Sequence, residues 1–509
     1  MRNQYLVACV ATFLLSVGAS LQLHAQEPGS ITWTPKVSVD LERKAIIVPS
    51  QFTSLGLDPV ANALSVPKGW TVSVFAATGL SKARFMAWGP DSVLFVANMN
   101  GNNVLALPDR NRDGVVDSVI IAARGFSGGH DVRFVRDTMY LAQEGSLVRL
   151  WRSDPRTLVY DQRVTVIDKA AQPNQLGGNH RTRTVVLDTL RRKIFLSVGS
   201  RGNADRETNR AVIEEYDYDG GSRRVFASGT RNSVGMTLHP RTGRLWANNN
   251  GSDLQGNNIP PEWIDIVRDG GFYGYPIAYH HQRYFTYGGD YSDLLPITSA
   301  DSSRVQSMVP PAALVDAHCA PMALEFTPAG FPNGYSNGLF MVMRGSWNRT
   351  PPSGAKVVFM RFDSDLDTIA NSVEDFCTGF IRDTTNQATR WARPVGIALS
   401  LDGSVYVSLD EGKQCILKLT PPKAPSSSDD DGANTGAARA FWSGDLLVVS
   451  SSVPDGYLEV FDASGRLVHR EHVQGIEARI STTAWPAGTY VLHLRTSNHV
   501  ATQKVQITR

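Results

Sequence analysis

Short apolar runs, each followed by a turn and a second apolar run, recur along most of the chain. Residues 84–97 show the unit clearly: one apolar run ends at Trp88, the turn contains Gly89 and Pro90, and a second run ends at the small residue Ala97. Apolar positions spaced as in an amphipathic helix are scarce. The pattern therefore predicts pairs of β-strands joined by tight turns.

The same unit recurs at residues 130–142, 182–198, 232–247, 321–343 and 394–408, which makes six copies. The copies start roughly 45 to 90 residues apart, the spacing of four-stranded blades with loop insertions. We therefore predict an all-β fold in which residues 65–420 form a six-bladed β-propeller. Loops at one end of such a ring converge on a central channel, where we expect the functional site.

The two ends of the chain differ from this body. Residues 1–25 contain Arg2, an apolar stretch over residues 5–17 and the small residue Ala25, which is typical of a secretory signal peptide. Residues 26–64 are interpreted as an N-terminal extension. Because no later stretch approaches 18 apolar residues, we expect no transmembrane segment and a secreted mature protein.

The composition changes again at the C-terminal end. Residues 421–439 are rich in Pro, Ser and Asp, which predicts a flexible linker. Short alternating runs follow at residues 446–450, 458–461, 490–494 and 504–507. They predict a small β-sandwich over residues 440–509.

Charge and cysteine content exclude some classes and leave others open. The formal net charge is only +2 and no long basic run occurs, so we expect no nucleic-acid partner. Cys9 lies in the signal peptide, which leaves Cys319, Cys377 and Cys415. These three allow one bridge, between Cys377 and Cys415, or three buried thiols.

A candidate calcium loop lies near the N-terminal side of the predicted ring. Oxygen-bearing side chains alternate around Gly114, as in loops that wrap Ca²⁺; they are Asp109, Asn111, Asp113 and Asp117. Ile120 stands where the bidentate Glu of an EF-hand would be. The alternatives are a structural Ca²⁺ site and a plain Asp-Gly hairpin turn.

Glycine-flanked segments at the starts of predicted blades carry the strongest candidates for chemistry. His180 follows two glycines, and its imidazole is interpreted as a general base in preference to a structural histidine. Arg231 and Asn232 begin the next unit, where a guanidinium can clamp a carboxylate or stabilise an oxyanion. The alternative for Arg231 is a salt bridge between adjacent blades.

Three other segments bring polar or cationic groups. The turn at residues 248–253, which includes Asn250, offers carbonyl and amide oxygens to a cation or a polar ligand. Residues 344–349 and 390–394 interleave arginines with tryptophan, which suits a flat polyanionic ligand or simply surface packing. The pairs at residues 280–281 and 318–319 lack a complete zinc spacing and are interpreted as lining or packing.

Taken in order, these motifs resemble the glucose/sorbosone dehydrogenase family, which uses pyrroloquinoline quinone (PQQ), and are most similar to its sorbosone and fungal pyranose dehydrogenase branch. The resemblance covers about residues 65–420. The motifs that carry it are Gly178–His180 with Arg183 and Thr184, residues 199–203, residues 228–235, residues 250–253 with 260–262, residues 345–349 and residues 393–396.

The resemblance implies a role for each matching residue. His180 matches the base that takes the proton from the substrate hydroxyl while hydride passes to PQQ. Arg231 and Asn232 match groups that hold the quinone oxygens. The turn after Asn250 matches the one whose Gly251 and Ser252 main-chain carbonyls bind the Ca²⁺ that polarises PQQ. The cations that face the PQQ carboxylates match Arg393 and Arg349.

The chain departs from soluble glucose dehydrogenases at two positions beside the base. Asn179 stands where that branch has an acidic residue, and Ser200 replaces another carboxylate. A large insertion around residues 279–310 is expected to reshape the substrate mouth. The identity of the sugar therefore does not follow from the resemblance, and glucose itself is in doubt. An external electron acceptor is expected.

The last 70 residues or so resemble the C-terminal sorting domain of type IX secretion. The similarity rests on residues 460–468, residues 486–491 and the terminal run that begins at Lys504. It implies export through the type IX machinery of a Gram-negative bacterium, by way of the periplasm, to the cell surface or the medium. An accessory fibronectin-like module is the alternative.

The sequence thus predicts a secreted PQQ- and Ca²⁺-dependent sugar dehydrogenase. Two alternatives remain at this point: a non-catalytic propeller that binds glycans at the cell surface, and a Ca²⁺-dependent lactonase on a similar ring.

Overall fold

The computed structural model of the chain describes residues 34–422 apart from 287–293, 295, 329–330, 332–333 and 401, and most of residues 438–507. Within the last part, residues 444–445, 452–454, 463–466, 475–476, 484 and 496–499 are not described. The predicted signal peptide and nearly all of the predicted linker lie outside the described residues. None of the described helices is long and apolar enough to cross a membrane.

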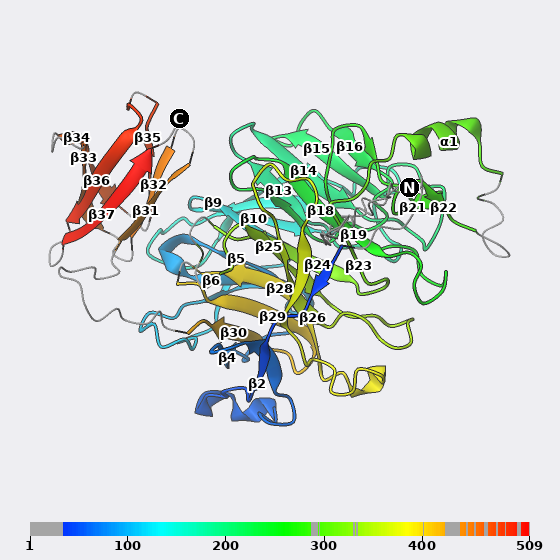
Figure 1. Cartoon of the computed structure of the whole chain (residues 1–509), viewed down its shortest axis with the longest axis horizontal. Coiled ribbons are helices and arrows are strands. Elements are labelled where there is room, and N and C mark those ends of the chain that lie inside the picture. Colours follow the sequence, from blue (N-terminus) through cyan, green and yellow to red (C-terminus); the bar gives the residue numbers. More distant parts are fainter. Residues whose placement is uncertain are drawn as a thin grey trace, which may run out of the picture.

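Strands dominate the described chain, which confirms the all-β prediction. Among the described residues, the main body contains six large sheets, each built on four antiparallel neighbours, and two small two-stranded sheets. Figure 1 labels many of these strands. The first two sheets contain β5 (Ala83–Trp88), β6 (Leu94–Asn98), β7 (Asn103–Leu107) and β8 (Ile120–Arg124), then β9 (Asp131–Val135), β10 (Thr138–Gln143), β11 (Ser146–Trp151) and β12 (Gln162–Asp168).

The third and fourth sheets follow in the same order. The third contains β13 (Val185–Asp188), β14 (Lys193–Val198), β15 (Val212–Asp217) and β16 (Arg224–Ser228), with β20 (Gly271–Phe272) added in parallel beside β16. The fourth contains β17 (Met236–Leu238), β18 (Leu245–Asn249), β19 (Glu262–Ile266) and β23 (Ala313–Val315).

The fifth and sixth sheets each include a strand from the N-terminal part of the chain. The fifth contains β24 (Pro321–Phe326), β25 (Gly338–Met343), β26 (Lys356–Arg361) and β27 (Ser372–Cys377), with β1 (Lys36–Val37) parallel to β27. The sixth contains β28 (Ala392–Leu399), β29 (Val405–Gly412) and β30 (Ile416–Thr420), and its fourth strand is β4 (Thr71–Ala76).

The first strands of the sheets form a closed cycle of contacts. Each first strand packs against the next, in the order β5, β9, β13, β17, β24, β28 and back to β5. Each predicted repeat unit coincides with the first two strands of one sheet. The middle strands β6, β18 and β25 are buried along their whole length, because sheets cover both of their faces.

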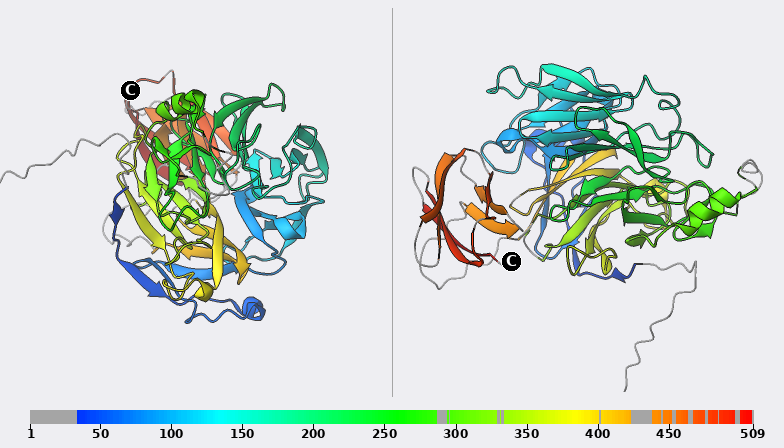
Figure 2. Two further views of the ribbon diagram at one scale, coloured as in Figure 1. Left: turned by 90° about the vertical axis from the view of Figure 1, so that its right-hand side faces the viewer. Right: turned by 90° about the horizontal axis from the view of Figure 1, so that it is seen from above.

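Smaller elements decorate this body. They are the hairpins of β2 (Leu41–Lys44) with β3 (Leu64–Pro67) and of β21 (Ala278–Tyr279) with β22 (Arg283–Tyr284), short 3₁₀ turns at Ser50–Leu55, Pro90–Ser92, Met99–Gly101 and Gln387–Thr389, and the helix α1 (Ser299–Gln306). Thr298 and Asp301 cap α1 reciprocally, and Arg206 anchors Asp301 through two hydrogen bonds of 3.0 and 2.8 Å. Helix α1 lies at the periphery of the main body (Figure 2).

The C-terminal strands form two further sheets, drawn in orange and red in Figure 1. One contains β31 (Ala438–Ser443), β32 (Leu446–Ser451) and β35 (Glu477–Ser481); the other contains β34 (Leu467–Gln474), β33 (Asp455–Asp462), β36 (Gly488–Arg495) and β37 (Val500–Ile507). Side chains from both sheets share one hydrophobic cluster, which includes Leu447, Ile480, Leu458 and Leu492. The four predicted strands of this region correspond to β32, β33, β36 and β37.

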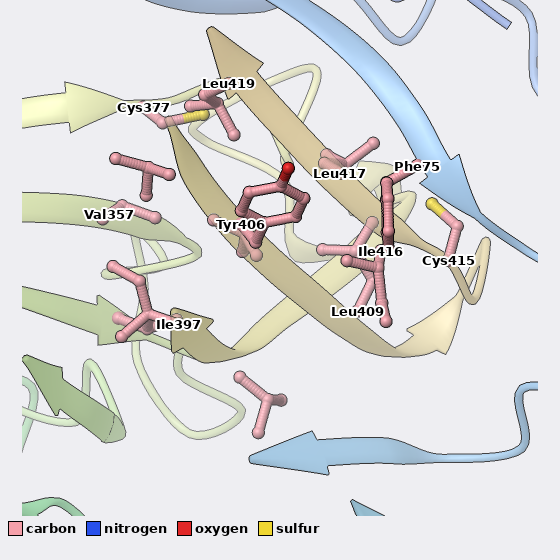
Figure 3. Close-up of a cluster of buried hydrophobic side chains, with 14 of the residues drawn as sticks. Phe75, Val357, Cys377, Ile397, Tyr406, Leu409, Cys415, Ile416, Leu417 and Leu419 are labelled. Atoms are coloured by element: carbon pink, nitrogen blue, oxygen red, sulfur yellow. The ribbon is translucent and has the colours of Figure 1, made fainter. Parts of the chain in front are cut away.

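The three cysteines of the main body are free and buried. Cys377 and Cys415 occupy separate places in one hydrophobic cluster with Phe75 and Tyr406 (Figure 3). The alternative of a disulfide between them is therefore wrong, and the alternative of buried thiols holds. Burial raises the pKa of the Cys415 thiol to about 12, so it stays protonated and packs as a small apolar group.

The pairing of β4 with β30 closes the ring without a covalent link, so we expect stability to depend on it. Val74 of β4 is fully buried, whereas the neighbouring Ser73 is only partly buried. Val74→Ala should lower the free energy of unfolding by about 2 kcal/mol, and the matched control Ser73→Ala should change it by less than about 0.5 kcal/mol. Urea unfolding measures both; equal effects would contradict a closure that depends on the buried face of β4.

Candidate functional site

Antiparallel topology gathers the predicted site residues at one end of the ring. In each sheet, the connection between the second and third strands and the connection to the next sheet lie at the same end. These connections hold His180, Ser200, Arg231 with Asn232, Asn250 to Ser252, and Arg349, while Arg393 lies near the start of β28. The Asp109 to Asp117 loop joins β7 to β8 and therefore lies at the opposite end.

The hydrogen bonds of His180 assign its tautomer. Its Nδ1 lies 3.0 Å from the Ser200 carbonyl oxygen and 2.9 Å from Ser200 Oγ. A carbonyl can only accept, and Ser200 Oγ gives its own proton to the Gly202 carbonyl at 2.8 Å. Nδ1 must then carry the imidazole proton, which leaves the lone pair on Nε2.

The surroundings of His180 keep the imidazole neutral. Burial, reinforced by the nearby guanidinium groups of Arg231 and Arg210, lowers the pKa of His180 to about 3. The hydrogen bond to Ser200 opposes this shift only in part. His180 is therefore in its proton-accepting form throughout the neutral pH range.

A glycine allows His180 and Asn232 to approach the same point. A Cβ atom on Gly199 would lie 2.6 Å from His180 Cβ and 2.7 Å from Asn232 Oδ1, closer than real Cβ contacts allow. Among the described residues, the Asn232 side-chain amide makes no hydrogen bond, so it is free to bind a ligand. The structure thus brings these two predicted site residues together.

Arg231 connects three of the loops at this end. It donates from Nε to the Asn203 carbonyl at 2.9 Å, from Nη1 to the Asn250 carbonyl at 2.9 Å and from Nη2 to Asp253 at 3.0 Å. Nη2 also donates to Asn203 Oδ1 at 2.8 Å. Four of its five N–H groups are therefore engaged within the protein, so Arg231 shapes the site in addition to the ligand-binding role expected from the sequence.

The turn after Asn250 presents main-chain oxygens. Gly251 donates its N–H to Glu262 at 2.6 Å, and a Cβ on Gly251 would lie 2.3 Å from Pro260 Cγ, so the turn requires glycine. Among the described residues, no hydrogen-bond donor engages the carbonyls of Gly251 and Ser252. Burial raises the pKa of Glu262 to about 8. The sequence motif contained Glu262, but sequence reasoning gave it no role.

Arg393 belongs to a group of arginines that exceeds its carboxylates. The group has four guanidiniums and two carboxylates, from Arg84, Arg344, Arg390, Arg393, Asp410 and Glu411. Arg84 and Arg344 bind Asp410, and Arg344 also donates to Glu411 at 2.8 Å. Arg393 lies at a β-bulge of β28, is 12% exposed and makes no hydrogen bond through its buried Nε, with Glu411 3.5 Å away.

The excess of arginines affects the pKa of Arg393. Burial, followed by the charges of Arg344 and Arg390, lowers this pKa to about 10. A buried cation surrounded by like charges favours an anionic ligand. The guanidinium of Arg349 holds the Asn257 carbonyl at 2.8 Å and Asn258 Oδ1 at 3.0 Å, and its role toward an anionic ligand stays a prediction.

Hydrogen bonds link the two halves of the site. Ser200 donates its N–H to the Arg231 carbonyl at 2.7 Å, and Asp253, which binds Arg231, accepts from Asn348 at 2.9 Å. Arg390 in turn donates to the Ser346 carbonyl at 2.8 Å. The segments that hold His180, Arg231 and the arginine group are therefore connected through hydrogen bonds and the short segment 346–348.

His318 and His280, which the sequence suggests as lining or packing groups, both lie inside the main body. His318 is buried and donates from Nε2 to the Gly256 carbonyl at 2.8 Å. His280 is also buried, and burial lowers its pKa to about 4. Within the described part of the chain, no three His, Cys, Asp or Glu side chains converge as a metal-binding group.

The candidate calcium loop folds on its own backbone. Asp109, Asn111 and Asp113 accept main-chain N–H groups of the loop at 2.8 to 3.0 Å, and Asp117 accepts from Arg110 at 2.6 Å. Asp109 Oδ1 is buried without a hydrogen bond, and burial raises the pKa of Asp109. A Ca²⁺ ion here stays a prediction.

Several relatives share part of the sequence. A pyrroloquinoline quinone-dependent pyranose dehydrogenase of Coprinopsis cinerea is 28% identical over 349 residues, which cover 55% of this chain and 44% of that protein. An uncharacterized protein of Borreliella burgdorferi is 23% identical over 373 residues, which cover 71% of this chain and 92% of that protein. The chain thus spans less than half the length of the Coprinopsis protein.

Solved structures support the same fold. The holo form of the pyranose dehydrogenase PQQ domain from Coprinopsis cinerea has a TM-score of 0.59 at 23% identity, covering 75% of this chain and all of that domain. The calcium structure of the Trichoderma reesei family AA12 enzyme has a TM-score of 0.59 at 21% identity and covers 72% of this chain and 98% of that one.

Two family matches divide the chain. Residues 444–508 match the secretion system C-terminal sorting domain, which confirms the similarity of the tail and indicates secretion. Residues 64–418 match the family described as TrAA12-like, which confirms the assignment made from the ordered motifs. On this match, which covers well over half of its residues, the chain belongs to the TrAA12-like family.

Proposed function

We infer that this protein is a secreted PQQ- and Ca²⁺-dependent dehydrogenase that oxidises a hydroxyl or hydrated aldehyde of a sugar. The observation that carries the proposal is the state of His180: a neutral imidazole with its lone pair on Nε2, beside the free amide of Asn232. The names of the Coprinopsis relatives, which are PQQ-dependent, support the choice of cofactor.

The residues present fit an anionic quinone and a hard cation. The buried Arg393 Nε has no hydrogen-bond partner among the described residues, and its group has more guanidiniums than carboxylates, so it suits the carboxylates of PQQ. The carbonyls of Gly251 and Ser252 suit Ca²⁺, which prefers oxygen ligands. When bound, PQQ supplies the two-electron acceptor for hydride.

The protein's own contribution is to orient the sugar and to move a proton. His180 Nε2 accepts the proton of the hydroxyl that is oxidised, and the Ser200 carbonyl, bound to Nδ1, holds the ring in the required tautomer. Arg231 and Asn232 would hold the quinone oxygens of a bound cofactor, where a cation and an amide donor favour negative charge. Ser200 replaces a carboxylate with a neutral partner, so this base works without an acidic orienting group.

The architecture suits a secreted propeller enzyme. The six sheets of the main body are the blades of a six-bladed propeller over residues 65–420, and the two C-terminal sheets are a sandwich over residues 440–509. The sandwich directs export through the type IX machinery of a Gram-negative bacterium after residues 1–25 act as a signal peptide. An external electron acceptor then reoxidises the cofactor.

One experiment separates this function from its two alternatives. Metal-stripped full-length protein is mixed with PQQ and either Ca²⁺ or Mg²⁺, its absorbance spectrum is recorded, and dye reduction is followed with a panel of pyranoses and aldoses. Cofactor uptake with sugar-dependent dye reduction supports the dehydrogenase. Cofactor uptake without reduction by any sugar favours a glycan-binding propeller, and lactone hydrolysis without PQQ favours a lactonase.

His180→Asn tests the proposed base, because Asn keeps a polar group near the position of Nδ1 and removes Nε2. We expect kcat to fall by about 100-fold or more, with PQQ binding retained, since proton transfer is lost and the cofactor contacts remain. The matched control is His239→Asn, a buried histidine in the β17–β18 turn at the opposite end of the ring. Unchanged kcat in His180→Asn would refute the assignment.

The protonation state of His180 can be measured without cofactor. With ring-labelled histidine, the NMR signal that is missing in His180→Asn should report a neutral ring protonated on Nδ1 down to pH 5, because the pKa is lowered to about 3. A histidine of ordinary pKa, about 6.5, would be almost fully protonated there. A ring that titrates near pH 6.5 would show that burial and the neighbouring arginines do not act as described.

A further inference from the structure

A second buried guanidinium, that of Arg210, holds the segment around His180. Arg210 follows β14 in the chain and is 3% exposed. It donates from Nε to the Gly199 carbonyl at 2.6 Å, and from Nη2 to the carbonyls of Gly177 at 3.1 Å, Ser200 at 3.2 Å and His180 at 3.4 Å. Nη1 reaches the carbonyls of Asn174 and Leu176 at 3.2 and 3.4 Å.

The Ser200 carbonyl joins Arg210 to the imidazole. It accepts from Arg210 Nη2 on one side and from His180 Nδ1 on the other. A carbonyl that is held in place by a charged donor keeps its orientation toward the imidazole N–H. Every other hydrogen bond of Arg210 also ends on a main-chain carbonyl, so within the described part of the chain no carboxylate accepts a hydrogen bond from the guanidinium.

We propose that Arg210 is a positioning residue for the reaction, which fixes the orientation and tautomer of His180 by holding both the His180 carbonyl and the Ser200 carbonyl. The catalytic consequence of this inference rests on the proposed function. The effect of Arg210 on the imidazole tautomer is independent of it. In many enzymes a carboxylate accepts the N–H of the catalytic imidazole and orients it. Here the acceptor is the neutral Ser200 carbonyl, and Arg210 holds that carbonyl in place.

The charges around His180 are consistent with this role. Arg231 and Arg210 are the cations that act on the imidazole. The nearest carboxylates are already engaged: Glu144 accepts the Gly177 N–H at 2.7 Å, and Glu207 accepts the N–H groups of Arg201 at 2.7 Å and Gly202 at 3.2 Å. Arg210 therefore contributes geometry and positive charge together, and two variants can separate these contributions.

Arg210→Lys keeps the charge but has too few donors for six carbonyls, whereas Arg210→Gln removes the charge as well. In the protein without cofactor, NMR of ring-labelled histidine should show that His180 loses its single Nδ1-protonated form in both variants. In the loaded enzyme, kcat should fall by about 10- to 100-fold, with the sugar KM within about two-fold. Only Arg210→Gln should shift the acid limb of the kcat/KM pH profile to higher pH. The imidazole then loses a neighbouring cation, which raises the pKa of His180.

Arg183 offers the matched control. It is fully buried and donates to the carbonyls of His180, Arg181, Thr182 and Gln175, but not to that of Ser200. Arg183→Lys should lower the thermal midpoint as Arg210→Lys does, yet keep the Nδ1-protonated signal of His180. This difference would support positioning through Ser200.

Two outcomes would overturn the inference. Arg210 would be merely structural if its Lys and Gln variants lost thermal stability but kept the His180 tautomer and the wild-type kcat. The same conclusion would follow if Arg183→Lys changed the tautomer as much as Arg210→Lys. Failure of the proposed function can be distinguished from failure of this inference. In the first case wild-type protein would reduce no dye with any sugar, and the NMR comparison in cofactor-free protein would still decide the role of Arg210.

Discussion

The site end of this protein depends on buried guanidinium groups that satisfy main-chain carbonyls. Residues 174–184 contain no strand or helix, so their carbonyls have no regular hydrogen-bond partners. Arg183 supplies donors to four carbonyls and Arg210 to six. A planar group with five donors can bind several segments of irregular backbone at once, which the lysine ammonium cannot do. The position of His180 follows from this arrangement.

Buried guanidinium groups also contribute to the electrostatics of the site. The cations that lower the pKa of His180 are Arg231, which also pairs with Asp253, and Arg210, whose hydrogen bonds all end on neutral carbonyls. Across the site, Arg393 lies among arginines that exceed their carboxylates. The two halves together create a positive region suited to an anionic cofactor and a neutral base. The scaffold that orders the loops is therefore also part of the chemistry of the site.

The repeat pattern was a good guide to the strands, and the ordered motifs were a good guide to the family. Each repeat unit coincides with two strands of one sheet, and the tail strands lie where alternation predicted them. The pattern missed β4, which precedes the first repeat and completes the last sheet. It also gave no sign that the Arg349 guanidinium holds Asn257 and Asn258. Pairing between distant segments has no signature in local periodicity, so neither result could be predicted from a single sequence.

The sequence by itself determined the all-β class, the strand pairs, the sorting tail and the choice of candidate site residues, because alternation and short motifs are local properties. Only the tertiary structure decided which loops share one end of the ring, which nitrogen of His180 carries the proton, and which main-chain groups Arg183, Arg210 and Glu262 bind. Those features depend on burial and on hydrogen bonds between residues far apart in the chain, such as Arg231 with Asn203 and Asp253. Their physical cause is the closure of the ring, which brings these segments together.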